Sequence, residues 1–191
     1  MGCITKEELN KIGFKSLGEN ILISDKCSIY SPEKISIGSN VRIDDFSILS
    51  GDLKIGSYIH IAAGCYLYGG ESGIEMMDFS GLSSRVSIYA ASDDYTGKSL
   101  TNPTVPEKYK RILKGKVTIE KHVIIGSSTV ILPRLTIREG ASVGAQSLVI
   151  KNCEEWMVYF GSPAIKLKER KKDLLKLEKE FLREKGGLNG K

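Results

Sequence analysis

The chain has 191 residues, of which 41% are apolar and 27% are charged, and its formal net charge is +5. This length is enough for one domain with a sizeable core, and the composition excludes a largely disordered chain. The mild basic excess fits either a nucleic-acid binder or an enzyme of anionic ligands such as phosphates. No apolar run approaches the roughly 20 residues that span a bilayer, and the N-terminus lacks the apolar segment of a secretory signal.

The cysteines are scattered along the sequence, at Cys3, Cys27, Cys65 and Cys153, and no two of them form a CxxC pair. A disulfide framework or a cysteine zinc site would show closer and more regular spacing. We therefore expect reduced thiols in a cytoplasmic protein without a bound metal.

The first expected element is a short helix over residues 5–12. Thr5 and Glu8 have the spacing of a capping box, and Gly13 is a typical stop signal for a helix. We interpret residues 1–20 as a capping helix that closes one end of the domain that follows.

Over residues 21–166, aliphatic residues recur every six positions. The runs are Ile37, Ile43, Leu49, Ile55, Ile61 and Leu67, then Met76, Leu82 and Ile88, then Leu113, Ile119, Ile125, Ile131, Ile137, Val143 and Val149. A helix would show a period of about 3.6, and a long amphipathic strand would show a period of two. A period of six instead predicts an all-β solenoid of short strands and corners, in which each inward residue stacks on its neighbours in adjacent turns.

The repeat stops after Ile88 and resumes at Leu113, with the polar segment 92–112 between them. Long loops in compact folds are uncommon and often functional. We expect this loop to contribute to a binding site, with a surface excursion that has no chemistry as the alternative.

Residues 167–191 change to a charged sequence with an apolar stripe that includes Leu174, Leu177 and Phe181. This spacing predicts an amphipathic helix that packs on the solenoid or on a neighbouring subunit. A basic helix that binds nucleic acid is the alternative, but acidic residues are interspersed among the basic ones, so we expect no nucleic-acid partner.

The segments IGSNVRI, IGSYIHIAAG, VIIGSSTVILPRLTI and ASVGAQSLVIKN resemble the hexapeptide-repeat acyltransferases, over roughly residues 20–168. The resemblance implies a left-handed parallel β-helix, although parallel crossovers in general are about 98% right-handed. It also implies transfer of an acyl group from coenzyme A to a hydroxyl or an amine. In this family the active sites lie in clefts between the subunits of a homotrimer.

In the sugar O-acetyltransferase branch of that family, a catalytic histidine follows a motif like I-Y-T-A-T-H. Asp93 stands in the matching place in this chain. A sugar hydroxyl needs a base poised near neutrality, whereas free Asp has a pKa of about 3.9. An amine needs less help, and a carboxylate can orient it. Asp93, with Asp94, Tyr95 and Asn102 as candidates for binding the acceptor, therefore favours an amino sugar; carboxylates that only solvate or cap the loop are the alternative.

The chain has two histidines, and both are candidates for a general base. His60 lies in a tract resembling the IHIG of sugar O-acetyltransferases, where it lies within the coil, and the sequence favours a structural role for it slightly over a catalytic one. We expect His122 at an outward-pointing corner that could face a neighbouring subunit, with a solvated turn as the alternative. Two histidines also argue against a γ-class carbonic anhydrase, which shares the solenoid but takes three for zinc.

The resemblance further implies a binding site for coenzyme A along the later coils. Its family motif G-A-G-S-V-V-T-K resembles residues 144–151, and the terminal G-x-P-A motif is intact at residues 161–164. Small corner residues would leave room for the extended pantetheine arm of coenzyme A, and lysines would neutralise the pyrophosphate and 3′-phosphate of the cofactor. The candidates are Gly126, Ser127, Gly144, Ala145, Lys151, Gly161, Pro163, Ala164, Lys166 and Lys168.

The sequence thus predicts an acetyl-CoA-dependent sugar acetyltransferase. We expect N-acetylation of a nucleotide-linked amino sugar for a surface polysaccharide, by direct attack of the amine on the thioester, because no Cys or Ser lies in the setting of a covalent nucleophile. O-acetylation of a galactoside-like acceptor is the rival reaction. A non-catalytic β-helix scaffold is the alternative from a different class.

Overall fold

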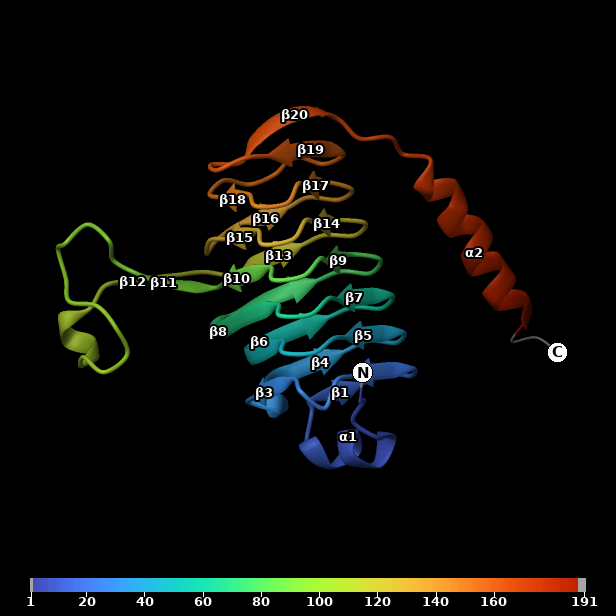
Figure 1. Ribbon diagram of the computed structural model, residues 1–191, viewed down its shortest axis with the longest axis horizontal. Coiled ribbons are helices and arrows are strands. Elements are labelled where there is room, and N and C mark those ends of the chain that lie inside the picture. The colour runs from blue at the N-terminus through green and yellow to red at the C-terminus, as the bar shows by residue number, and fades with distance from the viewer. Residues whose placement is uncertain (1, 189–191) are drawn as a thin grey trace.

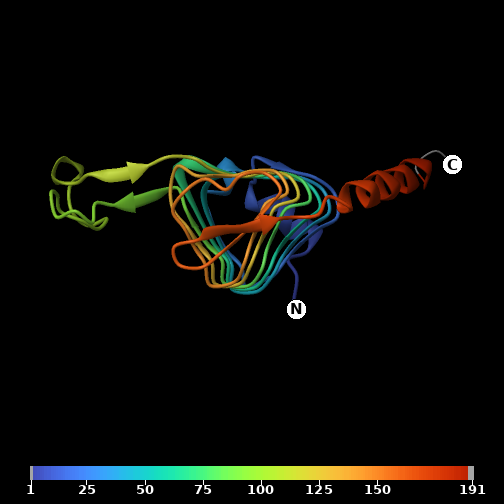
Figure 2. The ribbon, with the colours of Figure 1, turned by 90° about the horizontal axis from the view of Figure 1, so that it is seen from above.

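The computed structural model describes residues 2–188. Its body is a left-handed parallel β-helix of about seven coils with a triangular cross-section, as Figures 1 and 2 show. A hairpin leaves one corner of the triangle, and the C-terminal helix lies beyond another. The fold class expected from the sequence is confirmed.

Three faces run along the solenoid. The first face holds β1 (Ser16–Leu17), β4 (Ile35–Ile37), β13 (Val117–Ile119) and β16 (Thr136–Ile137). The second holds β2 (Ile21–Ile23), β5 (Val41–Ile43), β7 (Ile59–Ile61), β9 (Gly81–Leu82), β14 (Ile124–Ile125), β17 (Ser142–Val143) and β19 (Met157–Phe160). The third holds β3 (Ser28–Tyr30), β10 (Ser87–Tyr89), β15 (Val130–Ile131) and β18 (Leu148–Val149). The long strands β6 (Ile48–Ile55) and β8 (Tyr66–Met76) bend from the third face to the first.

The core consists of the six-residue repeat. Every position of the aliphatic runs is at most 3% exposed, apart from Leu113, which is 42% exposed. Adjacent coils stack these side chains in register, as where Val41 and Ile43 pair with Ile59 and Ile61. Leu113 keeps the six-residue spacing by coincidence, because it lies on the hairpin and not on the solenoid.

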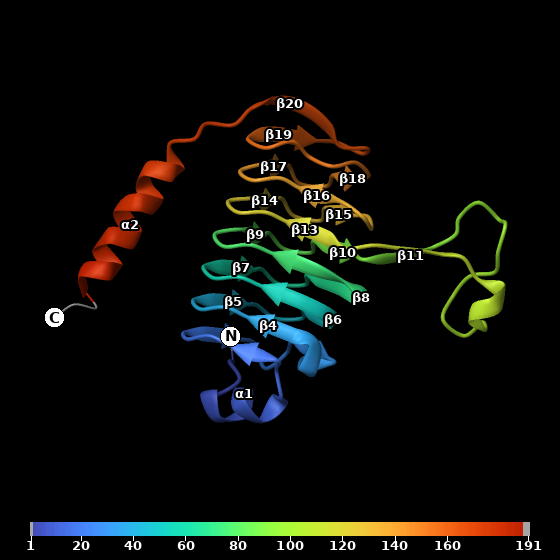
Figure 3. The ribbon, with the colours of Figure 1, turned by 180° about the vertical axis from the view of Figure 1, so that it is seen from behind.

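The break in the repeat forms an antiparallel hairpin. Its two strands are β11 (Ala91–Asp93) and β12 (Ile112–Lys114), and its tip carries the 3-10 helix η2 (Glu107–Tyr109). The hairpin projects far from the body (Figures 1 and 3). The expected loop at 92–112 is therefore present, with its base ordered as a two-stranded ribbon. A second 3-10 helix, η1 (Pro32–Lys34), lies on an early coil.

Both ends of the solenoid are closed. Helix α1 (Lys6–Ile12) has the expected capping box of Thr5 and Glu8, and Leu9 is buried in the core. At the other end, β20 (Ile165–Glu169) turns back antiparallel on β19, and helix α2 (Leu174–Leu188) follows. The expectation of a helical segment starting at residue 167 is therefore wrong over its first residues, because an edge strand covers the last coil before the helix begins.

Candidate active site

The hairpin base forms one candidate site at the corner where β11 leaves the solenoid, which we call the hairpin corner. Small-ligand sites typically measure roughly 300–1,000 Å³, and the pocket here measures about 760 Å³. Asp93, Tyr95 and Arg111 line it from the hairpin, and Leu132 and Arg134 line it from the solenoid. Arg134 stands where the family carries a glycine, so the sequence marked it as a residue that narrows the cleft or only decorates it, whereas Arg111 was not singled out.

Asp93 is partly exposed at this pocket, and its Oδ2 accepts a hydrogen bond from the backbone N–H of Asn102 at 3.1 Å. The other oxygen, Oδ1, makes no hydrogen bond to any residue between 2 and 188. The hairpin therefore fixes the carboxylate and leaves Oδ1 able to accept a hydrogen bond from a substrate.

The other residues predicted to bind the acceptor sugar have different roles in the structure. Asp94 accepts hydrogen bonds from the backbone of Thr96 at 2.8 Å and from Ser99 at 3.2 Å, and the bonds from Thr96 hold its pKa below the ordinary value. The side chain of Asn102 accepts two bonds from Thr104. Both side chains thus shape the hairpin. Tyr95, in contrast, is 91% exposed.

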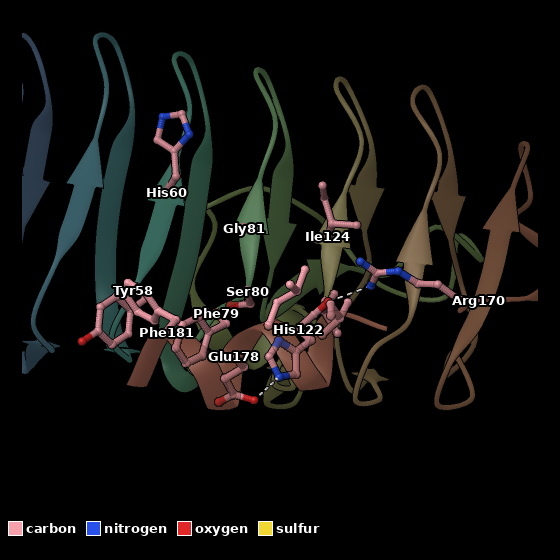
Figure 4. Close-up of a pocket in the computed structure, with 13 residues that line it drawn as sticks. Tyr58, His60, Phe79, Ser80, Gly81, His122, Ile124, Arg170, Glu178 and Phe181 are labelled. Atoms are coloured by element: carbon pink, nitrogen blue, oxygen red, sulfur yellow. Dashed lines mark hydrogen bonds and ion pairs between the residues drawn. The ribbon is translucent and has the colours of Figure 1, made fainter. Parts of the chain in front are cut away.

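His60 lies on the outward side of β7, in the middle of the second face (Figure 4). Its Nε2 lies 2.8 Å from Oδ2 of Asp44, whose other oxygen accepts a 2.7 Å bond from Nε of Arg42. Burial alone would raise the pKa of Asp44, but the bonds from Arg42 and His60 lower it below the ordinary value. The carboxylate therefore orients the imidazole, an arrangement found in many catalytic sites.

His122 points out of the solenoid at a corner, as expected, but it is not exposed there. It lies at the corner between the first and second faces, which we call the helix corner because α2 covers it. Its side chain is 5% exposed, and its Nε2 lies 2.9 Å from Oε2 of Glu178 on α2 (Figure 4). Its ring packs against Phe79 at 5.5 Å and Trp156 at 6.2 Å. The expectation of an exposed corner is wrong because a segment 56 residues later in the chain folds over it.

A smaller pocket of about 360 Å³ lies on the second face, between His60 and the corner that joins the second and third faces, which we call the third corner. Ser83 and Ser84 line it from one coil, and Ser127 lines it from the next. Of the predicted cofactor residues, only Ser127 lies in this pocket. The serines after β9 carried no signal in the repeat, because corner positions accept many small residues.

The predicted cofactor glycines are explained first by packing between coils. A Cβ on Gly126 would lie 2.4 Å from the backbone N of Ala145, and a Cβ on Gly144 would lie 2.3 Å from the ring of Phe160. At these two positions of the third corner, the next coil therefore lies too close for a side chain. A role of these residues in binding a cofactor stays a prediction.

The remaining cofactor candidates lie on the last coils. Gly161 donates its N–H to Ser147 at 3.1 Å, and Pro163 and Ala164 form the turn into β20. Lys166 donates to both carboxylate oxygens of Glu154 at 2.9 Å, and this bond raises its pKa. Lys168 is exposed on β20, and Lys151 is exposed near the hairpin corner.

Within one chain, the candidates form two separate groups. Asp93 and Tyr95 line the pocket at the hairpin corner, whereas His60 and Ser127 line the pocket on the second face, and neither of these two pockets holds members of both groups. Over residues 2–188 there is no cluster of His, Cys, Asp and Glu that could hold a metal ion. None of the helices in the described range is long and apolar enough to cross a membrane.

Comparison with known proteins places the chain among enzymes of similar length. No protein-family model matches it. It is 45% identical over 184 residues to a dTDP-4-amino-4,6-dideoxy-D-glucose acyltransferase of Escherichia coli, and the match covers 95% of each chain.

Two solved structures are equally similar in fold. One is a serine-to-alanine variant of AntD, an N-acyltransferase from Bacillus cereus, in complex with dTDP-4-amino-4,6-dideoxyglucose and coenzyme A. Its sequence is 54% identical to this chain, the TM-score is 0.95, and the match covers 96% of this chain and 98% of that one. The other is AntD in complex with dTDP and 3-hydroxybutyryl-CoA, at 53% identity and a TM-score of 0.96, covering 97% of this chain and 100% of that one.

Identity at this level along nearly the whole length, together with the triangular β-helix, establishes the family. The chain belongs to the hexapeptide-repeat acyltransferases, in the group that contains sugar-nucleotide acyltransferases such as the E. coli enzyme.

Proposed function

We propose that the protein transfers the acyl group of an acyl-CoA, acetyl-CoA in the first instance, to the amino group of a dTDP-linked 4-amino-4,6-dideoxy sugar. The observation that carries the proposal is the full-length similarity to enzymes whose names and bound ligands contain that sugar nucleotide and coenzyme A. The carboxylate of Asp93, in the place where O-acetyltransferases of the family carry a histidine, supports an amine over a hydroxyl acceptor.

The reaction balances without a covalent enzyme intermediate. The neutral amine of the sugar attacks the thioester carbonyl, a C–N bond forms, the C–S bond breaks, and coenzyme A leaves as the thiol after taking up the proton that the amine loses. Backbone N–H groups stabilise the oxyanion that develops on the carbonyl oxygen. The Asp93 carboxylate accepts a hydrogen bond from the amine and so directs its lone pair at the carbonyl.

Of the two histidines, His60 is the one available to receive a proton. It is half-exposed, and Asp44 fixes its ring with one nitrogen still free of that bond. His122 is buried and engaged by Glu178, so a catalytic role for it would require α2 to move away. We assign His122 a structural role and keep His60 as the candidate base.

A complete site needs a second copy of the chain, because Asp93 and His60 lie in separate pockets of one copy. The outward side of the third face supports this assembly, since it presents apolar and aromatic side chains and no charged ones between the hairpin corner and the third corner. Its residues include Ile48, Tyr66, Tyr68, Tyr89, Val130, Leu132 and Leu148. In a homotrimer, this face packs against a neighbour and brings the hairpin base of one copy towards the second face of the next.

The donor would lie along the third corner. Ser127 faces the small pocket there, and the flat backbone at Gly126, Gly144 and Ala145 lets an extended pantetheine pair with main-chain groups. The phosphates would meet Lys168 and Lys151, which are exposed, more readily than Lys166, which Glu154 already engages. Such a donor site distinguishes an enzyme from a scaffold with the same fold.

The setting of the reaction follows from its chemistry. Free thiols, including the buried Cys65 and Cys153, fit a cytoplasmic protein. Acylated deoxyamino sugars on a nucleotide carrier are precursors for glycosyl transfer, so we assign the product to the assembly of a surface polysaccharide.

The test compares two substitutions at neighbouring carboxylates. Asp93→Asn should lower kcat/KM for the dTDP-amino sugar by about 10²-fold, because an amide cannot hold the amine in the same way. Asp94→Asn is the matched control and should change kcat/KM only slightly, since Asp94 serves the turn of the hairpin. Equal effects of the two substitutions would contradict the assignment. Absence of acetyl-CoA-dependent stabilisation against thermal unfolding would favour the scaffold.

A further inference from the structure

A second pocket lies between α2 and the solenoid, beside the one that holds Ser127. It measures about 450 Å³ and is bounded by Phe79 at the helix corner and by Leu174, Leu177 and Phe181 on α2 (Figure 4). These side chains make its walls largely apolar. Its volume falls within the range of small-ligand sites.

Ser80 lines this pocket and lacks a hydrogen-bond partner. The residue is 3% exposed, and its Oγ bonds to no group of residues 2–188. Burying a hydroxyl without a hydrogen-bond partner is unfavourable, so a structure retains one mainly where something else satisfies it. A ligand with a hydroxyl or carbonyl group would supply the missing partner.

Gly81 connects this pocket with the small one. Its φ is not positive, and a Cβ added there would meet only the carbonyl oxygen of His60, at an ordinary 3.5 Å. The backbone therefore does not require glycine at this position. The missing side chain leaves a hollow between His60 and Ile124, and these three residues line both pockets.

The charges around the pocket fit an uncharged ligand. Glu178 is engaged by Lys121 and His122. Arg170 directs Nη1 at the carbonyl oxygens of His122 and Gly140, at 2.8 and 2.9 Å. Its guanidinium is thus committed to the backbone of the helix corner and is poorly placed to hold a phosphate.

We infer that this pocket receives the acyl chain of donors longer than acetyl-CoA, with the Ser80 hydroxyl bonding to a hydroxyl group on the chain. The inference rests on the proposed function, because the donor must lie at the third corner for its chain to run past Gly81. The acyl chain itself does not react, and bonds form and break only at the thioester carbonyl, as in the proposed transfer. The favoured donor class is a short hydroxyacyl-CoA.

The test compares acetyl-CoA, butyryl-CoA and 3-hydroxybutyryl-CoA with one dTDP-amino sugar acceptor. Leu177→Trp should fill the pocket and lower kcat/KM for both four-carbon donors about tenfold or more, with less than about a twofold change for acetyl-CoA. Leu182→Trp is the control, since Leu182 lies on the same helix, is 43% exposed and does not line the pocket. Thermal unfolding checks that both variants are folded equally well.

A second variant tests the hydroxyl separately. Ser80→Ala should lower kcat/KM for 3-hydroxybutyryl-CoA about tenfold relative to butyryl-CoA, and it should reduce the stabilisation by 3-hydroxybutyryl-CoA against heat by more than that by coenzyme A. The inference is overturned if the wild type uses only acetyl-CoA, if Leu177→Trp affects all donors equally, or if Ser80→Ala does not discriminate the two four-carbon donors. Failure of the proposed function would differ, because then acetyl-CoA too would give no product.

Discussion

Replacing His122 by asparagine should weaken the fold without removing catalysis. His122 has a φ of +61°, a conformation that asparagine tolerates and that Asn20 and Asn40 adopt at the same corner of earlier coils. The substitution therefore removes the imidazole without straining the backbone. It breaks the contact with Glu178 and the ring contacts with Phe79 and Trp156.

The magnitude follows from these lost contacts. A hydrogen bond to a charged group is worth about 1.5–3 kcal/mol, and each aromatic contact about 0.5–1.5 kcal/mol. Lys121 still engages Glu178 in the variant, so the carboxylate is not left unpaired. Because neighbouring contacts are not additive, we expect a loss of about 2–4 kcal/mol, which lowers the Tm of a chain of this size by roughly 5–15 °C.

The assay measures thermal unfolding and turnover of the same preparation. Trp156, the single tryptophan, lies against His122 and is 7% exposed, so its fluorescence reports the helix corner directly. At 25 °C, where the variant remains folded, kcat with acetyl-CoA should stay within about threefold of the wild type. A loss of kcat of about 10²-fold in a folded protein, or an unchanged Tm, would refute a structural His122.

The contacts described above make three further predictions. Ile43→Ala should cost about 2–5 kcal/mol in urea unfolding, because Ile43 is fully buried between coils; a cost below 1 kcal/mol would contradict the core assignment. Burial alone would raise the pKa of Glu178, but Lys121 and His122 hold it below its ordinary value. Its ion pairs therefore stabilise the docked α2 above the ordinary pKa of glutamate and are lost as the pH falls through the lowered pKa. Trp156 fluorescence should report that loss in the wild type and not in Glu178→Gln. Lys168→Met should raise KM for acetyl-CoA more than Lys166→Met, and the reverse order would contradict the donor site.

The regular part of the fold could be predicted from the sequence because each hexad obeys a local rule. Ile43 and Leu49 face inward, and the residues that follow at six-residue steps in later coils occupy the same buried environment. The six-residue period therefore predicts directly which side chains are buried. Leu113 shows the limit of that rule, since an aliphatic residue at the right spacing can lie on a hairpin. Strand β20 was missed because its alternating lysines suit an edge strand and a charged helix equally well.

The candidate site was harder to predict because it depends on contacts between distant segments. Asp93 could be placed at the base of a loop from the end of the repeat alone. The burial of His122 depends on α2, which lies 56 residues later in the chain at Glu178. The pair of Asp44 and His60 joins adjacent coils, 16 residues apart, and the coil length of the repeat could in principle have shown it.

The central claim is N-acylation of a dTDP-linked amino sugar, and product analysis tests it most directly. Purified protein would be incubated with acetyl-CoA and dTDP-4-amino-4,6-dideoxyglucose, with release of the coenzyme A thiol measured and the product examined by mass spectrometry and NMR. We predict one equivalent of thiol for each acetylated sugar, with the acetyl group on nitrogen and stable to mild base. An ester on a sugar hydroxyl, or no acetyl transfer by folded protein at saturating substrates, would contradict the claim.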